Sequence, residues 1–276
     1  MDAPLAVCSW SLQPSGPDEL LADLDAVGIP AIQLALDPVV NDPDVWGTTV
    51  SRLRDAGITI VSGMMGMAGE DYTTLETIRS SGGVRPDATW PANLVHATRI
   101  AETAAEAAIP LVTFHAGFIP DEPDDPERAK LIDRLHLVAD AFEPRGIRLG
   151  LETGQETAAT LEVLLSKLDR PVFEVNFDPA NMILYGMGDP VEAVKILAHS
   201  IGQVHIKDAT PTDTPGTWGT EVPVGTGAVD WSTFFAVLRR EATPTACVIE
   251  REAGEQRVAD VRTAGDVVRP LMEAGA

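Results

Sequence analysis

Short apolar runs alternate with longer amphipathic segments along the chain, and a glycine often ends the amphipathic part. A short apolar run is typical of a buried strand, and apolar positions three or four apart are typical of a helix packed on one face. Strands and helices in this repeating order predict parallel βα units. The expected strands cover residues 5–9, 31–36, 58–62, 111–114, 147–151, 172–177, 201–204 and 246–249, and the expected helices cover residues 18–27, 44–56, 91–108, 125–142, 157–168, 189–200, 231–240 and 256–273.

The repeating pattern predicts an α/β protein whose eight strand–helix pairs close into a (β/α)8 TIM barrel. A chain of 276 residues is a typical length for one such barrel and is long enough to bury a sizeable core. Since no linker-like stretch divides the chain, we expect residues 1–276 to form a single domain.

Residues 63–90 interrupt the pattern after the third expected strand. This segment contains Met64, Met65, Met67, Tyr72 and several glycines. A long insertion after the carboxyl end of a strand is usually functional in this architecture, although it can also be mere decoration. We expect residues 63–90 to form a lid.

The composition excludes several classes of protein. The chain carries 42 acidic and 20 basic residues, a formal net charge of −22, so phosphate backbones would repel it and nucleic acid is not an expected partner. Cys8 and Cys247 lie in apolar runs, which indicates buried free thiols. No basic N-terminal region precedes an apolar segment and no run is long enough to span a bilayer, which predicts a soluble cytoplasmic protein without a membrane partner.

Four metal-competent side chains stand at the ends of the last four expected strands: Glu152, Asp178, His205 and Glu250. The first two gaps between them match one strand–helix unit each, and the third matches such a unit with a long loop inserted. Active sites of TIM barrels form at the carboxyl ends of the strands. We therefore expect the four side chains to meet and bind one divalent metal ion.

Each of the four residues also has an ordinary structural interpretation. Glu152 could be a surface residue, Asp178 could cap a turn, and His205 could be a core histidine with satisfied hydrogen bonds. Glu250 could form an ion pair with Arg251. Taken together, four successive strands that each deliver a metal ligand are hard to assign to chance.

The ligand types restrict the metal. Three carboxylates and one imidazole form a hard, mostly anionic set with room for water or substrate, whereas a structural zinc site would favour thiolates. We expect Mn²⁺, with Mg²⁺ or Co²⁺ as alternatives.

At this point the sequence resembles the sugar phosphate isomerase/epimerase superfamily of xylose-isomerase-like TIM barrels, which includes ketose 3-epimerases, hydroxypyruvate isomerase, inosose dehydratase and apurinic endonucleases. The matching segments cover most of the second half of the chain, and His115-Ala116-Gly117 adds a match in the first half. They are Leu149-Gly150-Leu151-Glu152, Phe177-Asp178-Pro179-Ala180-Asn181, Val204-His205-Ile206-Lys207-Asp208, Gly225-Thr226-Gly227 with Asp230-Trp231, and Ile249-Glu250.

The resemblance implies that Glu152, Asp178, His205 and Glu250 bind the metal and that the two glutamates exchange protons with the substrate carbon. Ketose 3-epimerases typically carry a histidine where this chain has Asn181, and a second substrate-contacting glutamate where it has Ala158. These two differences leave the particular reaction open within the superfamily.

Further residues are expected at the same barrel mouth. His115, Lys207 and Asn181 would contact substrate oxygens, and Trp10 would form an apolar wall with Met64, Met65 and Trp218. Ordinary alternatives are a glycine-turn cap for His115, an ion pair with Asp208 or a metal-binding carboxylate for Lys207, and core packing for the apolar residues. Arg85 and the Gly225-Thr226-Gly227 loop are the segments that could meet a substrate phosphate.

These expectations define a divalent-metal-dependent isomerase or epimerase of a keto-sugar or sugar phosphate, working by proton abstraction beside a metal-polarised carbonyl. The alternative enzyme is a metal-dependent lyase or dehydratase acting on a keto-sugar or keto-cyclitol. Phosphodiester hydrolysis on DNA ranks low because the chain is so acidic. A non-catalytic sugar-binding subunit is the alternative outside the enzymes, and the sequence leaves room for a homo-oligomer.

Overall fold

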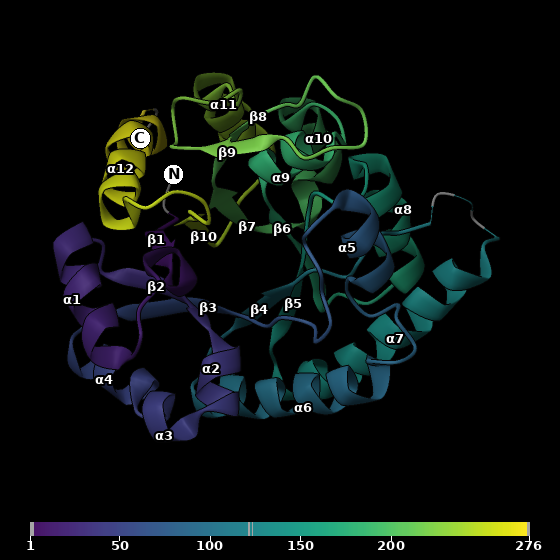
Figure 1. Cartoon of the computed structure of the whole chain (residues 1–276), viewed down its shortest axis with the longest axis horizontal. Helices are drawn as coiled ribbons and strands as arrows, with labels where there is room; N and C mark the ends of the chain where they lie inside the picture. Colours follow the sequence, from purple (N-terminus) through teal and green to yellow (C-terminus); the bar gives the residue numbers. More distant parts are fainter. Residues whose placement is uncertain (1–2, 121, 123, 275–276) are drawn as a thin grey trace.

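Eight parallel strands close into a barrel in the computed structural model, which describes residues 3–120, 122 and 124–274 (Figure 1). The order around the barrel is β1-β10-β7-β6-β5-β4-β3-β2, so neighbours in space are mostly neighbours in sequence. The predicted TIM-barrel fold is therefore confirmed. The strands are β1 (Leu5–Cys8), β2 (Ala31–Ala35), β3 (Thr59–Met64), β4 (Leu111–Phe114), β5 (Arg148–Glu152), β6 (Phe173–Phe177), β7 (Ile201–Ile206) and β10 (Ala246–Ile249).

Helices surround the barrel and bury their apolar faces against it (Figure 1). On α1, for example, Leu20 and Leu24 are buried one turn apart. Full burial of each such side chain contributes about 1.5–3 kcal/mol to folding. The surrounding helices are α1 (Pro17–Val27), α2 (Leu36–Asn41), α3 (Pro43–Trp46), α4 (Thr49–Asp55), α6 (Trp90–Glu106), α7 (Pro126–Phe142), α8 (Ala158–Leu168), α10 (Pro190–Leu197), α11 (Trp231–Glu241) and α12 (Arg257–Glu273), with short 3-10 turns at Ser9–Leu12, Glu143–Arg145 and Ala198–Ser200.

The prediction of one helix over residues 44–56 is wrong, because the two short helices α3 and α4 occupy this part of the chain, and α2 precedes them. Strand β2 ends at Ala35 and α2 begins at once with Leu36. Proline at the first position of a helix is favourable, but the preceding residue is pushed out of helical geometry. Pro43 therefore separates α2 from α3, and Asp42 between them has a non-helical backbone.

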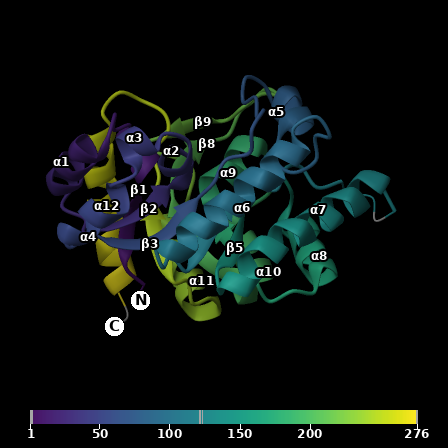
Figure 2. The ribbon, with the colours of Figure 1, turned by 90° about the horizontal axis from the view of Figure 1, so that it is seen from below.

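Four elements at one end of the barrel are not among the expected strands and helices. Helix α5 (Leu75–Ser81) lies within residues 63–90, α9 (Pro179–Tyr185) follows Asp178, and β8 (Asp208–Thr210) pairs antiparallel with β9 (Thr220–Val222). Figure 2 shows α5 and the β8–β9 hairpin at one end of the barrel, with both termini at the other end. The end that carries α5 and the hairpin is the barrel mouth, where the carboxyl ends of the strands lie.

Asp230 caps α11 by accepting a hydrogen bond from the Thr233 amide over 3.1 Å. Cys8 and Cys247 are both buried and form no disulfide, as expected. Among the described helices, none is both long and apolar enough to cross a membrane.

Candidate metal centre and substrate cavity

The four predicted metal ligands converge on one point at the barrel mouth. His205 Nδ1 lies 3.5 Å from Glu152 Oε1, 3.5 Å from Asp178 Oδ2 and 3.4 Å from Glu250 Oε2. One ligand atom from each residue lies within 4.8 Å of all the others. All four residues are buried, so this arrangement brings three carboxylates and an imidazole together away from bulk water.

Strand geometry produces this convergence. Glu152 is the last residue of β5, Asp178 directly follows β6, His205 is next to last in β7 and Glu250 directly follows β10. These four strands are consecutive around the barrel. Because the carboxyl ends of parallel strands meet at one rim, side chains far apart in sequence come within contact distance.

Two buried atoms in this cluster lack hydrogen-bond partners among the described residues: His205 Nδ1 and Asp178 Oδ2. The other carboxylate oxygen of Asp178 accepts a hydrogen bond from the Asn181 amide over 2.9 Å and caps α9. Asp178 therefore combines the structural role of a cap with an oxygen that remains available. A buried polar atom without a partner is costly, so the two orphaned atoms fit a site that binds a cation.

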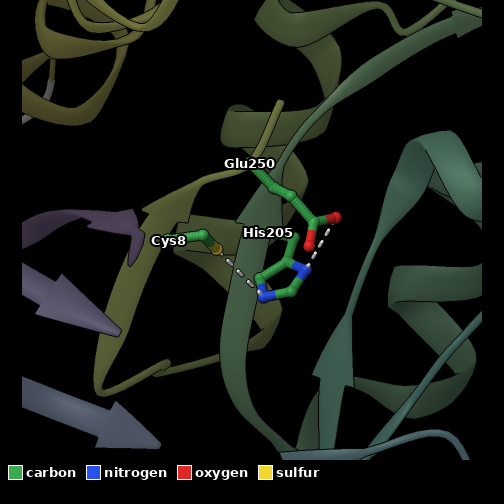
Figure 3. A group of neighbouring side chains, drawn as sticks. All are labelled: Cys8, His205 and Glu250. Atoms are coloured by element: carbon green, nitrogen blue, oxygen red, sulfur yellow. Dashed lines mark hydrogen bonds and ion pairs between the residues drawn. The ribbon is translucent and has the colours of Figure 1, made fainter. Parts of the chain in front are cut away.

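The other nitrogen of His205 points away from the carboxylates. Figure 3 shows the imidazole between Cys8 and Glu250, with the Cys8 sulfur 3.9 Å from Nε2. The closest contact of Nε2 is Gln33 Oε1, at 2.8 Å. A hydrogen on Nε2 would donate to this oxygen and leave the Nδ1 lone pair directed at the cluster.

A buried polar network below the cluster holds the ligands in place. Asn176 donates to Glu152 Oε2 over 3.1 Å and accepts from Gln203 over 3.1 Å, and Ser62 donates to Gln203 over 2.6 Å. None of these residues was predicted for the site, although an amide within an apolar strand run is a signal that could have found them. Part of the barrel interior is therefore a hydrogen-bonded support for the ligands instead of an aliphatic layer.

Lys207 lies above the cluster and is almost completely buried. Its ammonium donates to Glu250 Oε2 over 2.9 Å and to Asn181 Oδ1 over 3.2 Å, and it pairs with Glu252. The alternative in which Lys207 pairs with Asp208 does not apply, because Asp208 accepts from backbone amides of a neighbouring loop.

The alternative ion pair between Glu250 and Arg251 is also absent from the described contacts. Arg251 instead donates to Glu221 over 2.7 Å and to Asp260 over 2.8 Å. Glu250 accepts from Trp10 Nε1 over 2.8 Å. Trp10 therefore orients a carboxylate, and it is not among the residues that line the cavity next to the cluster.

A cavity of about 290 Å³ opens beside the cluster. Three residues predicted to contact substrate line it: His115, Asn181 and Lys207. His115 Nε2 lies 3.5 Å from Glu152, and Nδ1 has no hydrogen-bond partner among the described residues, so the glycine-turn cap is not observed. The remaining lining residues are Met64, Met65, Gly66, Glu70, Tyr72, Leu184, Tyr185, Trp218 and Glu252.

Mutual electrostatics shift the protonation of the clustered groups. Burial opposes a charge on His205, but the carboxylates of Glu250 and Glu152 outweigh it and raise the pKa of the imidazole. Burial also opposes ionisation of Glu250, yet Lys207 and His205 hold its pKa well below the ordinary value. Burial raises the pKa of Asp178. The cluster thus favours bound positive charge, which a proton on His205 supplies when no metal does.

Fold and site together define the class of protein. It is a closed (β/α)8 barrel in which three carboxylates and an imidazole gather at the mouth. The chain belongs to the xylose isomerase-like TIM barrel family, whose model matches residues 21–271. A search of curated protein sequences returns no match.

Solved structures show the same fold. A xylose isomerase domain protein from Planctomyces limnophilus is 28% identical, with a TM-score of 0.88 over 99% of this chain and 98% of that chain. An L-ribulose 3-epimerase is 16% identical, with a TM-score of 0.75 over 99% and 95%. The structure named "probable 3-DHS dehydratase AsbF" from Bacillus anthracis is 16% identical, with a TM-score of 0.73 over 96% and 98%. The fold is thus shared with a sugar epimerase and with a protein named as a probable dehydratase.

Proposed function

We propose that this protein is a divalent-metal-dependent isomerase or epimerase of keto-sugars or sugar phosphates. The observation that carries the proposal is the convergence of Glu152, Asp178, His205 and Glu250 beside a cavity, with His205 Nδ1 directed at three carboxylate oxygens and lacking a hydrogen-bond partner among the described residues. Family membership and the fold shared with a sugar epimerase support it.

The same four residues would hold the metal, and their hard oxygen and nitrogen atoms suit Mn²⁺, with Mg²⁺ or Co²⁺ as alternatives. A bound divalent ion polarises a ketone oxygen and thereby acidifies the neighbouring C–H bond.

Glu152 and Glu250 are the residues that we assign to proton transfer. They reach the cluster from β5 and from the end of β10, with β6 and β7 between them. In this proposal one carboxylate removes the proton and the other returns one, at the same carbon for epimerisation or at its neighbour for isomerisation. His115, Asn181 and Lys207 line the cavity. In this proposal His115 and Asn181 hold substrate oxygens, and the Lys207 ammonium does so by exchanging one of its carboxylate partners for substrate.

A second candidate function is a metal-dependent lyase or dehydratase on a keto-sugar or keto-cyclitol. The observation that favours it is that His115 and Lys207 both line the cavity, since either side chain can carry a proton to a departing hydroxyl. The dehydratase of the same fold is consistent with this candidate.

We further propose that residues 63–90 act as a lid over the single domain. Gly66, Glu70 and Tyr72 of this segment line the cavity, together with Met64 and Met65 at its beginning. A cytoplasmic location and a homo-oligomeric state remain predictions.

The test is metal analysis of the purified protein, followed by proton NMR in D₂O with a panel of ketoses and the metal restored. We expect Mn²⁺-dependent loss of a C–H signal next to the ketone, abolished by chelator. Formation of an unsaturated product would instead identify the lyase. Absence of both exchange and elimination across the panel would contradict the proposal.

A further inference from the structure

The charged groups on the cavity wall are mostly acidic. Glu70 and Glu252 line the cavity together with Lys207, and no arginine does so in the described part of the chain. The Lys207 ammonium already contacts Glu250, Glu252 and Asn181, so its three donors have partners. The cavity therefore offers no lysine or arginine that is free to bind an anionic group, and His115 is the remaining basic side chain on its wall.

The two segments that could meet a phosphate are engaged elsewhere. Arg85 donates to the Phe118 carbonyl over 3.0 Å and approaches Glu127 to 3.8 Å. The amides of Gly225 and Gly227 donate to Asp208 Oδ2 over 2.9 and 3.1 Å.

The loop around Asp208 is also too tight to accept a phosphate in place of the carboxylate. A Cβ on Gly227 would lie 2.1 Å from Asp208 Oδ1. In this loop an internal carboxylate occupies the position that a phosphate takes in a glycine-rich phosphate-binding loop.

The charge balance remains negative when a metal is counted. The ligands Glu152, Asp178 and Glu250 together with Glu70 and Glu252 supply five carboxylates, against the Lys207 ammonium and one divalent ion, which leaves a formal excess of two negative charges. The net charge of −22 on the whole chain adds to the repulsion of anions.

We propose that the substrate is an uncharged keto-sugar without phosphate or carboxylate, and that Glu70 is a residue that determines this specificity. The inference rests on the proposed function above. Glu70 holds the lid through the Gly83 amide, 3.0 Å from Oε1, and keeps further lone pairs for sugar hydroxyls. Met64, Met65, Tyr185 and Trp218 supply apolar contact for the sugar C–H faces. A volume of about 290 Å³ lies at the small end of ligand pockets, which span roughly 300–1,000 Å³, and fits a monosaccharide.

Matched pairs of sugars test the substrate class. Ketohexoses and ketopentoses, each with and without a terminal phosphate, are compared by C–H exchange in D₂O with the Mn²⁺-loaded protein, and by calorimetric titration. We expect kcat/KM and affinity to be at least about tenfold higher for the uncharged member of a pair, because like charges in a buried site repel strongly. Preference for the phosphorylated member, or equal use of both, overturns the inference while leaving the proposed function in place. If none of the sugars undergoes C–H exchange, the proposed function is contradicted. The calorimetric titration then tests the inference alone: tighter binding of the uncharged sugar supports it, and any other result overturns it.

Glu70→Gln removes one charge but keeps an oxygen that accepts from Gly83. We expect the discrimination against the phosphorylated sugar to fall by at least about threefold in this variant. Glu76→Gln, on the exposed face of α5 and outside the cavity, is the matched control and should leave the ratio unchanged. An unchanged ratio in Glu70→Gln, with the circular dichroism spectrum and melting curve retained, overturns the role of Glu70.

Discussion

His205 Nε2 lies 2.8 Å from Gln33 Oε1, on the side of the imidazole opposite the three carboxylates. Gln33 is itself held by Thr113, which accepts from its amide nitrogen over 2.7 Å. Both residues are fully buried. Asn176 Nδ2, a donor, lies 3.1 Å from the same nitrogen. The contact with the Gln33 oxygen, which can only accept, is the shorter of the two and favours the tautomer with hydrogen on Nε2 and a lone pair on Nδ1.

Gln33→Ala should therefore weaken metal binding. Removing the partner of a metal-binding histidine typically lowers metal affinity about 10–100-fold. Titration of the metal-free variant with Mn²⁺ measures this directly. Gln256→Ala, at an exposed position before α12, is the control and should bind Mn²⁺ like the unmodified protein. Equal affinity in all three proteins would show that Gln33 does not position His205.

Glu152→Gln and Glu250→Gln should each lower the rate of C–H exchange by about 10²–10⁴-fold, the usual contribution of a general acid or base. An amide keeps the shape of the side chain but cannot take up the proton. Glu162→Gln, exposed on α8, is the control and should retain full activity. If all three proteins bind sugar equally and none shows turnover, the chain is a non-catalytic sugar-binding protein.

Lys207→Met should destabilise the metal-free protein by about 3 kcal/mol, because Glu250 would lose a buried ion-pair partner. A divalent ion compensates the same carboxylates, so the loss should be smaller with Mn²⁺ bound. Lys195→Met is the control, since Lys195 pairs with Glu192 on the surface, where such pairs contribute at most about 1 kcal/mol. Urea unfolding of both variants, with and without Mn²⁺, checks this. Identical losses in the two metal states would contradict the electrostatic coupling between Lys207 and the metal site.

Glu156 should make the protein less stable as the pH rises. Burial raises its pKa from 4.5 to about 8, so the folded chain keeps a proton that the unfolded chain releases above about pH 4.5. The free energy of unfolding should therefore fall between about pH 4.5 and pH 8, by up to about 4 kcal/mol from this residue.

Glu156→Gln lacks this titration, so its stability relative to the unmodified protein should increase across the same pH window. Urea unfolding at pH 5, 6.5 and 8 measures the difference. Glu162→Gln should show a constant difference near zero, because this residue is exposed. A constant difference for Glu156→Gln as well would show that Glu156 is ionised in the folded state.

Local errors in the predicted elements have specific causes. The sequence pattern does not predict the β8–β9 hairpin, because Asp208–Thr210 and Thr220–Val222 are too short to show strand periodicity. The start of α9 is not evident from the sequence, because an Asp-Pro pair such as Asp178-Pro179 is typical of a turn as well as of a helix start.

The sequence alone determined the barrel and the four residues at its strand ends, because strand and helix periodicity and the order of the elements are local properties of the chain. Only the tertiary structure decided what surrounds those four residues. Gln33 meets His205, Trp10 meets Glu250, and Glu70 enters the cavity wall, each across a long sequence separation. Closure of the barrel creates these contacts, because it pairs β1 with β10 and brings the rims of β2 and β7 and the loops of the mouth together around one axis.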